Sequence, residues 1–198
     1  MFNPGELNEK ISLLTLNQNG NTYAWEASSN IWAKAEQLNS TNLFSRVGLG
    51  AKSIKFIIRK NKNLTLHNAF LWRGRHCFLT DIKEFDRAYY EVTTALVEPV
   101  ACTVMRAGEP KLNELNRPVY GNLIQVTFPG CLTEKYMGHV QNEPMATREI
   151  RYVLVTPKPI KVNCGELITI NNLTYHVLIA HELDEYKNEY EIMYEGDI

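Results

Sequence analysis

The sequence predicts a mostly β fold, built as two tandem domains of similar pattern. Three observations predict this class. Short segments rich in β-branched and aromatic residues alternate polar and apolar side chains, and Asn, Gly and Pro separate them. Helical signal is scarce. A weak internal repeat relates the two halves of the chain.

The strand pattern recurs along the whole chain. The expected strands are 9–16, 30–38, 53–60, 68–72, 75–82, 88–97, 100–106, 121–128, 149–156, 166–170, 173–181 and 187–194. The one segment that could open a short helix is 40–50, with Ser40 or Thr41 as its N-cap. Gly48 and Gly50 would end such a helix within two turns.

The internal repeat has a spacing near 96 residues. Residues 54–58 lie over residues 150–154, and every apolar position of the first segment meets an apolar one in the second. Further on, 90–92 (Tyr-Glu-Val) matches 190–192 (Tyr-Glu-Ile) at a spacing of 100. Chance agreement between two alternating β patterns is the alternative, but the preserved order of the pieces favours duplication.

The duplication divides the chain near Glu98 and Pro99, because proline interrupts a strand ladder. We therefore expect a first domain over 1–98 and a second, divergent domain of similar pattern over 99–198.

Composition excludes several classes of protein. Of the 198 residues, 44% are hydrophobic and 22% are charged, which is typical of an ordinary globular chain and excludes general disorder. No apolar run approaches the roughly 20 residues of a membrane-spanning helix, and the start has no signal-peptide pattern. Cysteines at 77, 102, 131 and 164 show no paired spacing, so we expect reduced thiols in a cytoplasmic chain, most of them buried.

Charge is unevenly distributed. Residues 1–99 carry 12 basic and 9 acidic side chains, whereas residues 100–198 carry 9 and 13. The basic excess is local and includes Lys52, Lys55, Arg59, Lys60 and Lys62. Alternation in this strand predicts a packed face of Ile54, Phe56 and Ile58 and a wet, positive face of Lys55, Ile57 and Arg59.

The first half has an order of features that resembles a known family. It opens with Asn3-Pro4-Gly5-Glu6-Leu7, followed later by Trp32-Ala33-Lys34-Ala35-Glu36, the strand at 54–59 and the aromatic segment at 72–78. This order resembles the head-tail joining proteins of tailed bacteriophages, also called head closure or stopper proteins. The resemblance covers residues 5–97, and the second half lacks both the Gly-Glu-Leu opening and the Trp-Ala pair.

The resemblance implies that the two tandem domains, 1–98 and 99–198, are small β-barrels with a short helix or long loop in each. It also implies a loop between two strands that projects to the axis of a ring. Residues 39–52 would form it, with the channel residues Asn42, Leu43, Phe44, Arg46, Gly48 and Gly50. Lys52, Lys55 and Arg59 would face DNA. A loop of this length is uncommon in a compact domain and is usually functional or disordered. The alternative is a surface loop with a small helix folded over the barrel mouth, but the resemblance favours the projecting loop.

The resemblance also implies the partners and the place of the protein. It predicts a homo-oligomeric ring in the neck of the virion, assembled in the host cytoplasm, which retains and passes double-stranded DNA. A portal or adaptor protein would lie above it and a tail-tube or tail-terminator protein below, with no membrane contact. Two alternatives remain open: a tail-completion or tail-terminator subunit, and a nucleic-acid-binding barrel in which Phe56 and Trp72 stack bases.

Enzyme chemistry finds little support in the sequence, so we predict no catalytic residues, no cofactor and no metal. His176 and His181 are five residues apart and should face opposite sides of one strand. Cys77 follows His76 directly and is expected to be a buried structural thiol. Gly48-x-Gly50 lacks the remaining residues of a phosphate-binding loop.

Overall fold

The computed structural model describes residues 3–42, 51–108, 110–112, 115–135 and 151–197. In these residues the chain is mostly β, which confirms the coarse prediction, and the helices are two three-residue 3-10 turns, η1 (Pro4–Glu6) and η2 (Glu195–Asp197). No α-helix occurs in this part of the chain, so the helix that each half could have contained is missing here.

Six strands from the first half pair into a closed ring. The pairings run β1 to β4, β5, β6, β3 and β2, and β2 pairs back to β1. The strands are β1 (Glu9–Asn19), β2 (Thr22–Asn42), β3 (Ala51–Arg59), β4 (Ala69–Trp72), β5 (Arg75–Asp86) and β6 (Tyr89–Val97). We call this the first ring.

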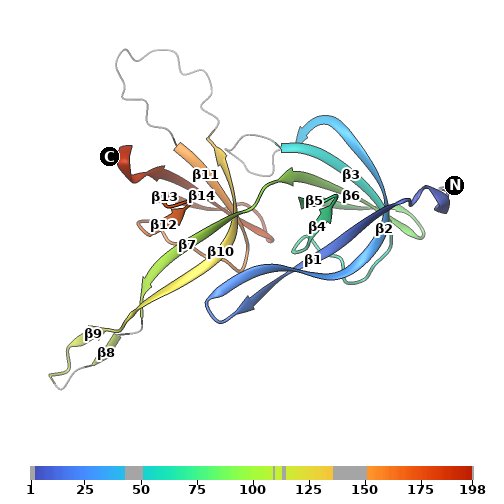
Figure 1. Cartoon of the computed structure of the whole chain (residues 1–198). Coiled ribbons are helices and arrows are strands. Elements are labelled where there is room, and N and C mark those ends of the chain that lie inside the picture. Colours follow the sequence, from blue (N-terminus) through green and yellow to red (C-terminus); the bar gives the residue numbers. More distant parts are fainter. Residues whose placement is uncertain (1–2, 43–50, 109, 113–114, 136–150, 198) are drawn as a thin grey trace, which may run out of the picture.

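Six strands from the second half close in the same way. The pairings run β7 to β12, β13, β14, β11 and β10, and β10 pairs back to β7. The strands are β7 (Val100–Ala107), β10 (Leu123–Glu134), β11 (Arg151–Pro157), β12 (Leu167–Ile170), β13 (Leu173–Glu182) and β14 (Lys187–Tyr194). This is the second ring, and Figure 1 shows it beside the first.

The two rings have the same strand order. β3 is the third strand of the first ring along the chain and lies between β2 and β6. β11 is the third strand of the second ring and lies between β10 and β14 in the same way. Their register against the last strand also agrees, because Ile58 lies opposite Tyr90 and Leu154 lies opposite Tyr190. The repeat seen in the sequence therefore corresponds to equivalent hydrogen-bonded positions.

Each ring encloses its own apolar core. In the first, the side chains that face inward include Ile11, Phe56, Phe70 and Val92, all fully buried. In the second, the largest are Phe128, Leu154, Ile168, Ile170 and Ile192. Alternation along each strand produces these cores because every second side chain points to the same face.

A third apolar cluster joins the two rings. Phe78 and Ala95 of the first ring pack with Cys131, Val153 and Val155 of the second. The ammonium of Lys187 on β14 lies over the ring of Phe78 at 5.2 Å from its centroid. The outer faces of β11 and β14 are therefore buried against the first ring rather than exposed to solvent.

Each expected strand overlaps an observed one, but two features differ. β2 extends across Thr22–Asn42, so residues 22–29, for which no strand was expected, belong to it. The short strands β8 (Pro110–Leu112) and β9 (Pro118–Tyr120) were also not expected. They form a separate hairpin that extends away from the second ring (Figure 1).

Candidate nucleic-acid interface

The predicted channel loop is shorter than expected. Thr41 lies opposite Lys52 and Asn42 opposite Ala51, so these residues extend the β2–β3 ladder instead of belonging to a loop. Asn42 is thus a strand residue, and the helix considered for 40–50 does not form over residues 40–42. The other predicted channel residues, Leu43, Phe44, Arg46, Gly48 and Gly50, lie outside the described residues.

The three predicted DNA-facing cations lie on one strand but in different surroundings. Lys52 and Arg59, near the two ends of β3, are exposed, whereas Lys55 is partly buried. The Nζ atom of Lys55 lies 3.1 Å from an oxygen of Glu36 and 3.6 Å from one of Glu91. The charge of Lys55 is therefore balanced by two carboxylates of the neighbouring strands.

Lys55 is one member of a chain of ion pairs across the first ring. The ammonium of Lys34 lies 2.7 Å from Glu6 and 2.9 Å from Glu36, and Glu36 in turn binds Lys55. The pKa of Glu36 lies below its ordinary value because both lysines donate hydrogen bonds to it. Glu6, Lys34, Glu36, Lys55 and Glu91 form the ion network, which is a structural feature rather than a free positive surface.

The predicted wet, positive face of β3 is wrong in part. Ile57, expected on that face with Lys55, is only 4% exposed. Both faces of β3 are covered at its centre, and only the strand ends leave cations in solvent. Phe56 is fully buried and meets Trp72 edge to face at 5.8 Å between ring centroids. Phe56 is therefore part of the core and presents no face on which a base could stack.

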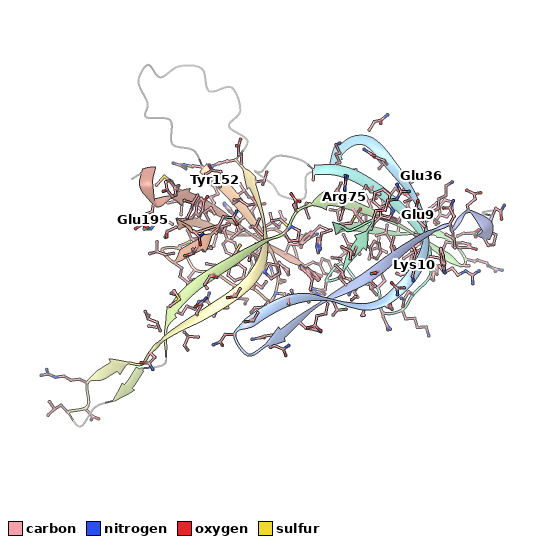
Figure 2. The ribbon with its side chains drawn as sticks, in the orientation of Figure 1. Glu9, Lys10, Glu36, Arg75, Tyr152 and Glu195 are labelled. Carbon is pink, nitrogen blue, oxygen red and sulfur yellow. The ribbon has the colours of Figure 1, made fainter. Side chains whose placement is uncertain are left out.

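A second group of cations lines a cavity formed by residues of the first ring. The cavity has a volume of about 290 Å³, and Lys52, Arg73 and Arg75 line it together with Gln37 and Trp72. We call these three cations and their cavity the basic mouth. Figure 2 shows Arg75, Glu9 and Glu36 on the first ring. The sequence reasoning included Lys52 but missed both arginines, which are distant from it along the chain.

The β4–β5 turn brings the two arginines to the mouth. Trp72 and Arg75 pair directly, so only Arg73 and Gly74 connect the strands. Both have positive φ, 50° and 75°, as in a type I′ hairpin turn. The guanidinium of Arg73 binds Glu9 and stacks at 4.8 Å over the Trp72 ring. Because Arg73 donates to it, the pKa of Glu9 lies below its ordinary value.

Another cavity, of about 630 Å³, lies beside the linker between the rings. Trp25, Arg75, His76, Val97 and Glu98 are among its lining residues. His76 is 7% exposed, and its Nε2 atom has no hydrogen-bond partner among the described residues. Burial lowers the pKa of His76 to about 4, so the ring is neutral at pH 7. This pocket is lined by apolar side chains and an uncharged imidazole, together with the charged residues Arg75 and Glu98.

The residues weighed for enzyme chemistry have structural surroundings. Burial raises the pKa of the Cys77 thiol to about 12, which makes it a poor nucleophile. A β-bulge between Val177 and Ile179 places His176 opposite Met193 and His181 opposite Glu189. Both histidines thus share one face of the sheet, contrary to the expected alternation.

Each of these histidines is close to a different carboxylate. His181 lies 3.3 Å from Glu191, and His176 lies 3.9 Å from Glu195. Within the described ranges, no group of three or more His, Cys, Asp or Glu side chains is arranged to hold a metal ion. In the same ranges, none of the helices is long and apolar enough to cross a bilayer. Cys77, Cys102 and Cys131 are buried free thiols, and Cys164 is an exposed one.

Comparison with known proteins identifies no relative: no family model, curated protein or solved structure matches the chain.

Proposed function

We propose that the chain is a structural component of the head-tail connector, or neck, of a tailed bacteriophage. The observation that carries the proposal is the agreement between the two six-stranded rings in strand order and in register. We interpret them as two tandem β-barrel domains, 1–98 and 99–198, derived by duplication. A subunit of two small barrels is suited to assembly into a larger structure.

The motifs behind the resemblance support this proposal through their contacts. Glu6 of the opening segment binds Lys34 of the Trp-Ala-Lys segment, so the two motifs meet in space. Ala33 is fully buried, whereas Trp32 on the same strand is 57% exposed. An exposed tryptophan favours a contact surface, since tryptophan is enriched in protein interfaces. Trp32 therefore has a role consistent with subunit contact.

In this proposal the protein forms a homo-oligomeric ring around double-stranded DNA. A portal or adaptor protein contacts one side and a tail-tube or tail-terminator protein the other, in a virion assembled in the host cytoplasm. A closed ring uses heterologous contacts, in which one surface of a subunit meets a different surface of the next. Six chains would present twelve barrels to a twelvefold portal, and twelve chains would match it one to one.

Electron microscopy and mass measurement of the purified full-length protein test the proposal. We expect closed rings with a central channel, alone or after mixing with a portal, and a mass that corresponds to six or twelve chains. Binding to isolated tails but not to portals would favour a tail-completion subunit instead. A monomer that binds neither portal nor tail would overturn the proposal.

A further inference from the structure

The basic mouth has features that its fold does not require. Type I′ turns favour Asn, Asp and Gly, because a side chain at positive φ is strained. Arg73 nevertheless occupies the first position of such a turn, at φ 50°. Holding an arginine in the left-handed region strains its backbone. A hairpin that served only to reverse the chain would not need this side chain.

The second ring provides an internal comparison for this turn. The β12–β13 hairpin has the same two-residue connection, formed by Asn171 and Asn172 at φ 50° and 64°. These two residues match Arg73 and Gly74 in place, and Leu173 matches Arg75. Asparagine is among the residues that suit positive φ, so the second ring has ordinary turn chemistry. The two arginines are therefore particular to the first ring.

The charges at the mouth are only partly balanced. Glu9 binds Arg73, which fixes the guanidinium over Trp72. Among the described residues, neither Lys52 nor Arg75 forms an ion pair, and no acid lines the cavity. The mouth therefore has a net positive charge, with the amide of Gln37 as a further possible donor. In contrast, Lys55 and Lys34 are balanced within the ion network.

Phosphate is the chemical group that suits this arrangement. A guanidinium offers a planar fork of N–H donors that matches phosphate oxygens, and a lysine adds a compact positive charge. A cavity of about 290 Å³ admits a phosphate but not a base pair. A duplex lying across the mouth could place one backbone phosphate in the cavity without any base contact. Such phosphate contacts position a protein on DNA without reading its sequence.

We propose that the basic mouth binds a phosphate group through Lys52, Arg73 and Arg75. The group is a backbone phosphate of DNA or a free phosphate ion. The DNA source rests on the proposed function, because it assumes a ring around a duplex, whereas the site itself stands on its geometry. Arg73 and Arg75, rather than the ion-paired Lys55, are then the residues that contact phosphate together with Lys52.

The test uses a double variant, Arg73→Asn with Arg75→Leu, which gives the first hairpin the residues that the second ring has at the same places. The matched control, Lys10→Gln with Arg87→Gln, also removes two positive charges, from exposed positions outside the cavity. Binding of a labelled duplex of about 30 base pairs is measured by fluorescence anisotropy from roughly 50 to 200 mM salt. Inorganic phosphate is titrated separately while the arginine Nε resonances are followed by NMR.

We expect the double variant to bind the duplex at least about tenfold more weakly, with the slope of log affinity against log salt reduced by about 1 for each cation removed. The control should keep most of the wild-type affinity. Phosphate should shift the Nε resonances of Arg73 and Arg75 in the wild type. If phosphate shifts them but duplex binding is equal in the variant and the control, the source is free phosphate.

The proposal is overturned if phosphate leaves both resonances unchanged and the double variant binds the duplex as the control does. Ring formation by the double variant, observed by electron microscopy, separates this result from the proposed function. A variant that assembles rings without binding phosphate leaves the neck assignment intact. A wild-type protein that binds phosphate but never forms a ring contradicts the neck assignment alone.

Discussion

Asn68 and Glu166 hold the same position in the turns that precede β4 and β12. Asn68 accepts a hydrogen bond from the backbone N–H of Thr65 at 2.9 Å, and Glu166 accepts one from that of Asn163 at 2.8 Å. Each side chain also binds the first strand of its own ring. Asn68 donates to the carbonyl of Leu14 at 3.2 Å, and Glu166 accepts from Arg106 at 2.9 Å. An amide and a carboxylate thus fulfil one structural role, because each offers an oxygen to the backbone N–H three residues earlier.

Replacing Asn68 should destabilise the first ring. Asn68→Ala removes the acceptor for Thr65 and leaves the Leu14 carbonyl without this donor, in a position that is only 9% exposed. We expect a loss of about 1–3 kcal/mol in the free energy of unfolding, since buried polar groups would lose their partners. Urea denaturation followed by circular dichroism measures it. Lys62→Ala, at an exposed nearby position, is the control, and equal midpoints for both variants would contradict the role assigned to Asn68.

Stability should fall as the pH drops from 6.5 towards 4 because of His76. Burial lowers the pKa of His76 from 6.5 to about 4, so in this range the unfolded chain binds a proton that the folded chain does not. The resulting loss is about 2 kcal/mol at pH 5 relative to pH 7. In His76→Leu, which cannot titrate, the difference between pH 7 and pH 5 should be smaller by that amount. Urea denaturation at both pH values measures it, and an unchanged difference would show that His76 is protonated normally in the folded state.

Gly130 should not tolerate a larger residue. At this position β10 changes partner: Gly130 lies opposite Val100 of β7, and Cys131 lies opposite Val155 of β11. A Cβ atom there would lie 2.6 Å from Leu154 and 2.9 Å from Cys102. We expect Gly130→Ala to cost about 1–3 kcal/mol through overpacking.

Thermal unfolding of Gly130→Ala and of a control, Ala101→Ser at an exposed site, measures this cost. Leu154→Val in the Gly130→Ala background should restore part of the stability, because it removes the closest atom. A Gly130→Ala protein as stable as the control would mean that the β10 bend has room for a side chain.

The ion network should contribute a modest, salt-sensitive stabilisation. Glu36→Gln keeps the size of the side chain but removes the carboxylate that binds Lys34 and Lys55. Because Glu36 is partly exposed, solvent screening limits the loss to about 1 kcal/mol at low salt and less at high salt. Chemical denaturation by urea at two salt concentrations checks this. The control is Glu84→Gln, which removes the carboxylate that pairs with Lys60. Glu84 is more exposed than Glu36, so its loss should have a smaller effect. A salt-independent loss of stability in Glu36→Gln would indicate packing rather than charge.

The strands were predictable because their signal is local. Alternation at Ile54, Phe56 and Ile58 identifies β3 and its core face, and all three side chains are buried as expected. The same rule was wrong for Ile57 because it assumes that one face of a strand is wet. Here residues distant in sequence cover that face as well. Nor could alternation place His176 and His181, since the bulge after Val177 shifts every later side chain by one position.

The sequence by itself determined the β class, the positions of nearly all strands and the repeat that relates Tyr90 to Tyr190, because period and composition act between near neighbours along the chain. Only the tertiary structure decided which cations are balanced and which are free to bind. Lys55 is paired with carboxylates of β2 and β6, and Arg73 is paired with Glu9. Lys52 and Arg75, which have no ion pair among the described residues, line a cavity together with Arg73. Charge balance depends on distances of a few Å between side chains, and ring closure sets those distances among residues that are far apart along the chain.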